Sequence, residues 1–180
     1  GTLADGSAYL VMEYVRGEPL TTACRDRALD LRERARLVAQ IARGVHYAHQ
    51  RLVIHRDIKP GNLLLRDDGR PVLLDFGIAK LFAPGQRYAT ATQPWFTPAY
   101  ASPEQKRNQP VSTATDVYAL GLVLCELLSG REPKIADDGS VTAPSQRSGD
   151  AQSFRLRGDL DAIVARACAP EPHRRYASAE

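Results

Sequence analysis

The apolar positions of the chain recur mainly at helical spacing. The clearest run is at Leu31, Ala35, Val38, Ala42 and Val45, whose steps of three and four residues place them on one face of a helix. Asp30 precedes this run, and Glu33 lies where the partner of a capping box belongs. We therefore predict a long amphipathic helix that ends near Gln50. A shorter helical stretch is predicted at residues 20–29.

Two further helices are predicted towards the end of the chain. Residues 114–128 are apolar almost all round, which is typical of a helix buried in the middle of a domain, and Gly130 supplies its stop. Residues 159–168 form a last amphipathic helix. Between them, residues 131–155 are polar and contain Gly, Ser and Pro, so we expect a flexible insertion.

Short apolar runs predict strands. Residues 9–15 are rich in aromatic and branched side chains and indicate a buried strand. Residues 62–65 and 72–74 indicate a hairpin, because the Asp-Asp-Gly-Arg segment between them favours a tight turn. Residues 78–110 contain several prolines and no sustained period, so they are predicted to form a long loop.

Composition narrows the class of protein. The 180 residues are 43% hydrophobic and 25% charged, as in ordinary globular domains. The net charge of +3 is small and spread out, so no nucleic-acid partner is expected. The three cysteines lie far apart and favour a reducing, cytoplasmic setting without zinc or disulfides. No apolar run approaches the ~18 residues of a membrane span.

Two motifs carry the chemistry. Residues 55–62 read His-Arg-Asp-Ile-Lys-Pro-Gly-Asn, and residues 75–77 read Asp-Phe-Gly. Asp57 can orient a hydroxyl, while Asn62 and Asp75 offer the hard oxygen ligands that Mg²⁺ prefers. Any one of these residues could be an ordinary loop residue, but the joint pattern argues for phosphoryl transfer. It resembles the catalytic loop and metal loop of the eukaryotic-type Ser/Thr protein kinases.

The resemblance covers nearly the whole chain and implies an α+β, protein-kinase-like fold. It implies a mostly α-helical C-terminal lobe with a hinge strand and a small β-hairpin, the N-terminal lobe being largely absent. Residues 1–15 would be the last N-lobe strand and hinge, and residues 16–180 the C-terminal lobe. The activation segment would be residues 75–104. The chain is expected to be truncated at both ends.

The resemblance assigns catalytic roles. Asp57 would accept or orient the substrate hydroxyl, and Asn62 and Asp75 would hold the metal. Lys59 would contact the transferred phosphate and Asp57, which marks Ser/Thr specificity. Thr97 would bond Asp57 and Lys59. The usual Gly before that Thr is Phe96 here, so the backbone path of this segment departs from the family pattern.

The resemblance also implies a nucleotide site at the hinge. Met12 would be the gatekeeper, the Glu13 carbonyl and Val15 amide would bond the adenine edge, and Leu64 would pack beneath the ring. An apolar strand residue explains Met12 and Leu64 equally well, so these positions remain open.

Other positions would support the site. Arg56 would receive a phosphate carried by Thr90 or Thr92, although two threonines in a solvated loop explain the same sequence. Glu104 is expected to pair with a buried Arg175. The remaining supports would be Asp116, which would accept hydrogen bonds from the backbone near His55 and Arg56, and the packed residues His55 and Phe76.

The function implied is transfer of the ATP γ-phosphoryl group to Ser or Thr hydroxyls of protein substrates, with Mg²⁺ or Mn²⁺. Bacterial members of the family are similar in their Ser-Pro-Glu-Gln segment at residues 102–105. A dimer of kinase domains is left open. The glycine-rich loop and the Lys before the hinge are not found, because all four lysines follow Asp57. We therefore expect the chain by itself to transfer phosphate poorly.

Two alternatives remain. A pseudokinase or docking module would bind partners without catalysis. A small-molecule phosphotransferase also uses an Asp-Asn-Asp set, but Lys59, Thr97 and Glu104 occupy positions that serve a peptide substrate. The sequence before Gly1 would decide whether the missing parts exist.

Overall fold

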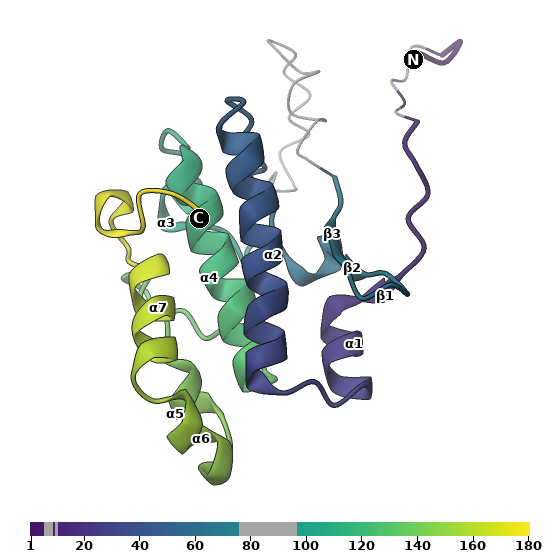
Figure 1. The fold of residues 1–180 in the computed structure, drawn as a ribbon. Helices are drawn as coiled ribbons and strands as arrows, with labels where there is room; N and C mark the ends of the chain where they lie inside the picture. The colour runs from purple at the N-terminus through teal and green to yellow at the C-terminus, as the bar shows by residue number, and fades with distance from the viewer. Residues whose placement is uncertain (6–8, 10, 76–96) are drawn as a thin grey trace.

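The computed structural model describes residues 1–5, 9, 11–75 and 97–180. Helices dominate, and the described strands form one three-stranded antiparallel sheet. Figure 1 shows α2 (Leu31–His49) and α4 (Thr113–Ser129) side by side, with α7 (Asp159–Ala167) packed against α4. The small sheet packs against α1 (Leu20–Asp26), and its strand β3 (Pro71–Leu73) contacts α2.

The other elements are short. They are β1 (Glu18–Pro19), β2 (Leu63–Leu65), β3 (Pro71–Leu73), α3 (Pro103–Lys106), α5 (Pro144–Arg147) and α6 (Asp150–Leu156), with 3₁₀ turns at Pro60–Asn62 and Pro172–Arg174. Among the described helices, none is both long and apolar enough to cross a membrane.

Helix α2 begins at the predicted capping box. The Asp30 carboxylate accepts the Glu33 amide at 2.8 Å, and the Glu33 carboxylate accepts the Asp30 amide at 2.7 Å. These two bonds satisfy amides that a helix start leaves without partners. The helix ends at His49 with Gln50 as its cap, as the sequence predicts.

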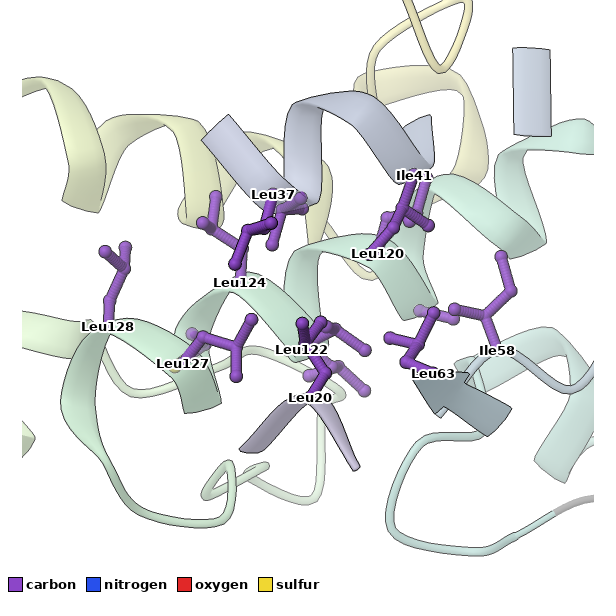
Figure 2. Packing of buried hydrophobic residues seen from close by; sticks show 14 of the residues in the cluster. Leu20, Leu37, Ile41, Ile58, Leu63, Leu120, Leu122, Leu124, Leu127 and Leu128 are labelled. Carbon is purple, nitrogen blue, oxygen red and sulfur yellow. The ribbon is translucent and has the colours of Figure 1, made fainter. Parts of the chain in front are cut away.

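Helix α4 is the centre of the core. It is buried along nearly its whole length, and it ends at Gly130, which adopts a left-handed conformation (φ 70°) that glycine tolerates without strain. Figure 2 shows the leucines of α4 meeting side chains of α2, α1 and β2, including Leu37, Ile41, Leu20 and Leu63. Burial of these side chains is the main source of stability.

The predicted hairpin is confirmed with a shift of one residue. Leu64 of β2 pairs with Val72 of β3, and Gly69 at the turn has a φ of 80°. The sequence did not predict β1, whose Glu18 pairs with Leu65 on the other side of β2. In β2, Leu63 and Leu65 face the core and Leu64 faces the opposite side, half-buried.

The buried strand predicted for residues 9–15 is wrong. Its described residues are not in a strand, and Val11, Met12 and Tyr14 are 82%, 55% and 84% exposed. A strand is stable when a neighbouring strand pairs with its amides and carbonyls. Among the described residues near the N-terminus, the backbone hydrogen bonds instead join Gly1 with Tyr9. High β-propensity alone did not create a strand here.

Two loop predictions are also corrected. Residues 131–155 are not a flexible insertion, because they contain α5, α6 and a bridge between Ile135 and Val141. Ser145 and Ser153 lie within α5 and α6, and Leu156, the last residue of α6, is fully buried. Within the predicted loop 78–110, α3 begins at Pro103, and the hydroxyl of its N-cap residue Ser102 accepts the Gln105 amide. Residues 78–96 of that loop lie outside the described residues.

Candidate active site

The 55–62 loop and the segment that begins at Thr97 meet at one lysine. The Lys59 ammonium lies 3.0 Å from the Asp57 carboxylate and donates a hydrogen bond of 2.8 Å to the Thr97 hydroxyl. The side chains of Asp57 and Lys59 are 26% and 28% exposed, so both remain accessible to a substrate. Thr97 is therefore joined to Asp57 through Lys59.

The orientation of Asn62 follows from its contacts. Its side-chain amide donates to the Asp57 carbonyl at 2.8 Å and approaches the Asp57 carboxylate at 3.4 Å. Only the NH₂ end of the amide can donate to a carbonyl, so the amide oxygen is turned the other way. Asn62, five residues after Asp57, is buried and is the last residue of the 3₁₀ turn Pro60–Asn62.

Asp75 is placed by its neighbour Leu74. The Leu74 amide donates to the Asn62 carbonyl at 2.8 Å, and the Leu74 carbonyl lies 2.9 Å from His55 Nε2. Because a carbonyl only accepts, His55 Nε2 carries a proton. Asp75 itself is exposed and has a φ of 54°, a conformation that costs free energy for a residue other than glycine. Its backbone is thus tied to the same loop as Asp57 and Asn62.

Asp116 anchors the 55–62 loop from inside the protein. Its carboxylate accepts the amides of His55 and Arg56, each at 2.8 Å, as the sequence analysis expected. Arg56 has a φ of 70°, so the loop is held in a strained conformation directly before Asp57. Hydrogen bonds to a buried carboxylate are strong enough to maintain such strain.

Sequence reasoning missed two residues here. His49 Nε2 lies 2.8 Å from the Asp116 carboxylate, across 67 positions of the chain. Gln105 accepts the Ser102 amide with its side-chain oxygen and donates to the Arg56 carbonyl at 2.8 Å. A Gln at the third position of a short capped helix indicates the bond between Gln105 and the Ser102 amide. No local pattern indicates the bond from Gln105 to the Arg56 carbonyl.

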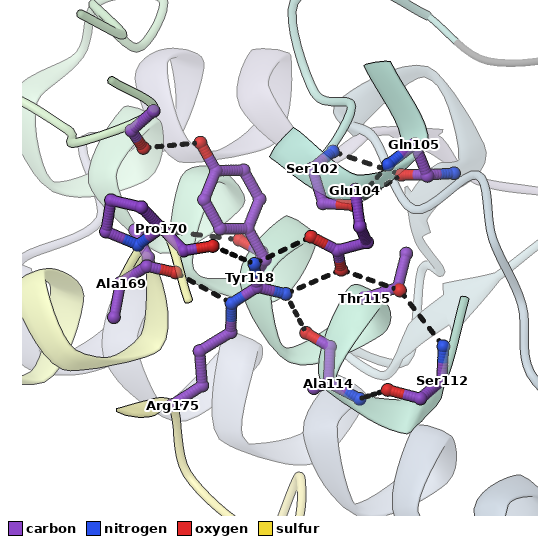
Figure 3. A network of polar contacts seen from close by, with 12 residues as sticks. Ser102, Glu104, Gln105, Ser112, Ala114, Thr115, Tyr118, Ala169, Pro170 and Arg175 are labelled. Carbon is purple, nitrogen blue, oxygen red and sulfur yellow. Dashed lines mark hydrogen bonds and ion pairs between the residues drawn. The ribbon is translucent and has the colours of Figure 1, made fainter. Parts of the chain in front are cut away.

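Glu104 and Arg175 form the predicted ion pair. Arg175 Nη1 and Nη2 donate to the two Glu104 carboxylate oxygens at 2.7 and 2.8 Å (Figure 3). Thr115 adds a hydrogen bond of 2.8 Å to the same carboxylate. Burial by itself raises the pKa of Glu104, but the hydrogen bonds from Arg175 and Thr115 outweigh it and hold that pKa below its ordinary value.

A second acidic group holds the segment after Thr97. The Tyr100 hydroxyl donates to the Glu126 carboxylate of α4 at 2.5 Å. Burial raises the pKa of Tyr100, and the neighbouring Glu126 adds to this effect. Burial also raises the pKa of Glu126. Tyr100 therefore stays protonated and acts as a hydrogen-bond donor that fixes the segment to α4.

The expected nucleotide contacts are only partly assembled. Met12 and Glu13 lie exposed and Val15 half-exposed in an extended segment, and Leu64 faces outward from the small sheet. Gly17 brings this segment against β2, since a Cβ there would lie 2.7 Å from the Leu65 carbonyl oxygen. The expected sites at Phe76, Thr90 and Thr92 lie outside the described residues.

The donors at Asn62 and Asp75 fit a hard divalent cation. One supplies an amide oxygen turned away from Asp57, and the other an exposed carboxylate. In the described part of the chain no three or more His, Cys, Asp and Glu side chains gather as a metal cluster. A cation held here would rely on few protein ligands and on phosphate oxygens, which is the mode that suits Mg²⁺.

A profile of the protein kinase domain matches residues 3–175. The chain belongs to the protein kinase family. This kinase chain is 36% identical to the serine/threonine-protein kinase PknB of Mycobacterium tuberculosis over 99% of its length and 30% of that protein. It is 35% identical to PknB of Mycolicibacterium smegmatis over 95% of its length and 28% of that protein.

A shorter match is 41% identical to the serine/threonine-protein kinase PknA of Mycobacterium tuberculosis, over 76% of this kinase chain and 31% of that protein. The chain thus spans about three tenths of the length of the curated relatives it matches. Membership of the family implies the use of ATP and a divalent metal.

Proposed function

We propose that this chain belongs to a Ser/Thr protein kinase and forms the side of its active site that receives the protein substrate. The contact that supports this most directly is the Lys59 bridge between Asp57 and Thr97. It couples the residue that handles the proton to the segment on which a peptide would lie. Because Lys59 and Thr97 occupy positions that serve a peptide substrate in the family, this contact favours a protein kinase over a small-molecule phosphotransferase.

The proposed chemistry needs positioning and charge balance. The Asp57 carboxylate accepts the proton of a Ser or Thr hydroxyl while that oxygen bonds to the γ-phosphorus of ATP. The bond from that phosphorus to the oxygen of the departing ADP breaks. The Lys59 ammonium lies beside Asp57 and offsets the negative charge on the transferred group.

We assign Asn62 and Asp75 as the metal ligands. Two hard oxygen donors that leave most of the shell to phosphate and water suit Mg²⁺, and they suit Mn²⁺ as well. The metal supplies charge neutralisation on the phosphates when bound. We assign the adenine contacts to Met12, Glu13, Val15 and Leu64, with residues 1–15 as the hinge and residues 16–180 as the helical lobe.

Arg56 is the proposed receptor for a phosphate on Thr90 or Thr92. Its Nε atom is buried and has no partner among the described residues, whereas a phosphate would supply one. We also propose a cytoplasmic setting and protein substrates. The three cysteines are buried and lie far apart in the chain, which supports a reducing compartment.

The test uses the longest natural protein that carries this chain. Transfer from γ-labelled ATP to Ser, Thr and Tyr peptides is measured with Mg²⁺ and with Mn²⁺. Asp57→Asn is expected to abolish transfer and retain ATP binding, while Asp67→Asn, in the exposed hairpin turn, is the matched control. Labelling that persists in Asp57→Asn overturns the assignment. ATP binding without any transfer by the unaltered protein would instead identify a pseudokinase.

A further inference from the structure

The side chain of Gln105 connects the start of α3 with the loop that carries Asp57. Its oxygen accepts the Ser102 amide at 3.1 Å, and its NH₂ group donates to the Arg56 carbonyl at 2.8 Å, across 49 positions of the chain. Figure 3 shows Gln105 and Ser102 side by side. Gln105 is 7% exposed, so little water competes for either bond.

The two partners determine which end of the Gln105 amide faces each of them. A backbone amide only donates and a carbonyl only accepts, so Oε1 faces Ser102 and Nε2 faces Arg56. The capping box of α3 needs an oxygen at this position, which a Glu side chain supplies as well as a Gln side chain. Only Gln also provides the donor that the Arg56 carbonyl accepts. Capping of α3 therefore explains only one of the two bonds.

The bond to Arg56 acts on the peptide unit that directly precedes Asp57. Arg56 has a φ of 70°, which costs free energy for a residue other than glycine. The carbonyl of this peptide unit accepts from Gln105 at 2.8 Å, and its amide, which belongs to Asp57, lies 3.3 Å from His55 Nδ1. Because the contact to Gln105 is the shorter of the two, it is the stronger restraint on this unit. The Asp116 carboxylate holds the preceding amides instead, those of His55 and Arg56.

A rotation of the Arg56–Asp57 peptide unit would change ψ of Arg56 and φ of Asp57, and with them the direction of the Asp57 side chain. We propose that Gln105 is a positioning residue for phosphoryl transfer: its Nε2–H holds the Arg56 carbonyl and thereby aims Asp57 at the substrate hydroxyl. The role in transfer rests on the proposed kinase function. Since Gln105 lies in α3, the bond also makes the direction of Asp57 depend on the placement of the segment that begins at Thr97.

The test compares three variants in the longest natural protein that carries the chain. Gln105→Met keeps the length of the side chain and removes both bonds, whereas Gln105→Glu keeps an oxygen for the Ser102 amide and removes the donor to Arg56. Gln109→Glu is the matched control, because it makes the same chemical change at an exposed position nearby. Both Gln105 variants should lower kcat by roughly tenfold to a hundredfold, with KM for ATP nearly unchanged. Gln109→Glu should match the unaltered protein.

The comparison between the two Gln105 variants separates positioning from capping. A loss of kcat in Gln105→Met that Gln105→Glu does not share would assign Gln105 to the cap of α3 alone and overturn the proposal. An unchanged kcat in both variants would overturn it as well. Thermal unfolding shows which variants are folded, and Gln105→Met, which places no charge in the interior, keeps the test decisive if Gln105→Glu does not fold.

Hydrogen exchange of three loop amides gives a second readout that needs no enzyme activity. In the Gln105 variants the Asp57 amide should exchange faster, while the amides of His55 and Arg56, which Asp116 holds, should keep their protection. Faster exchange at all three amides, or unchanged exchange at Asp57, overturns the proposal. If the unaltered protein transfers no phosphate, the proposed function fails, and the exchange rate at Asp57 still decides whether Gln105 holds this peptide unit.

Discussion

Arg175 donates two hydrogen bonds to the carboxylate of Glu104 in the interior of the protein, where the side chains are 0% and 4% exposed. Its other three N–H groups reach the carbonyls of Ala169, Ala114 and Pro170 (Figure 3). All five guanidinium donors are therefore used. This arrangement ties the end of the chain to α3 and α4.

Removing one partner of the Glu104–Arg175 ion pair should destabilise the folded protein. Arg175→Met leaves the Glu104 carboxylate buried without its cation, and we expect the free energy of unfolding to fall by about 3–5 kcal/mol. Urea denaturation measures this change. Arg70→Met, which breaks an exposed pair with Asp68, is the control and should change stability little. A fall no larger in Arg175→Met than in the control would contradict a structural role for the pair.

Acid should weaken the same interaction. The pKa of Glu104 is lowered in the folded protein, so its contribution to stability is present above the unfolded value of 4.5 and is lost as pH falls through the folded pKa. Urea titrations between about pH 7 and pH 3 should show this loss. Glu104→Gln cannot titrate and should show a shallower decline at acid pH. An equal decline of stability with falling pH in the unaltered protein and in Glu104→Gln would argue against a lowered pKa of Glu104.

The Thr97 hydroxyl should matter for turnover. Thr97→Val removes the oxygen that accepts from Lys59, so Lys59 loses one of its two anchors, and kcat should fall by roughly tenfold to a hundredfold. Thr97→Ser retains the hydroxyl and should keep most of the activity. Steady-state kinetics with a Ser or Thr peptide measures both. Similar turnover in Val and Ser variants would mean that the Lys59–Thr97 bond serves folding alone.

Gly17 should not tolerate a side chain. In Gly17→Ala the new Cβ would lie 2.7 Å from the Leu65 carbonyl oxygen and 3.3 Å from Leu64 Cβ, so β1 must move away from β2. We expect a loss of about 1–3 kcal/mol in stability, together with weaker ATP binding because Leu64 is displaced. Thermal unfolding and nucleotide titration measure the two effects.

Gly44→Ala is the matched control for this substitution. Nothing lies within 4 Å of a Cβ at Gly44, and the residue lies inside α2. Alanine should stabilise that helix by about 1 kcal/mol because it favours helical backbone more than glycine does. The two glycine variants should therefore change stability in opposite directions, and a stabilising Gly17→Ala would show that β1 and β2 separate without cost.

Local patterns predicted the helices well because a helix depends mainly on neighbouring residues. The capping box at Asp30, the apolar positions of α4 and the stop at Gly130 were all legible in the sequence. The extended segment at residues 11–15 was not, because a strand needs a partner elsewhere in the chain and propensity does not supply one. The α5 and α6 helices were missed because they are short and rich in polar residues.

The sequence by itself determined the family, and the spacing of Asp57, Asn62 and Asp75 predicted the kind of chemistry. Only the tertiary structure decided which distant groups meet. Lys59 contacts Thr97 across 38 positions, and His49 contacts Asp116 across 67. Such contacts depend on how α2 packs against α4, and packing is a property of the assembled core rather than of any local run of residues.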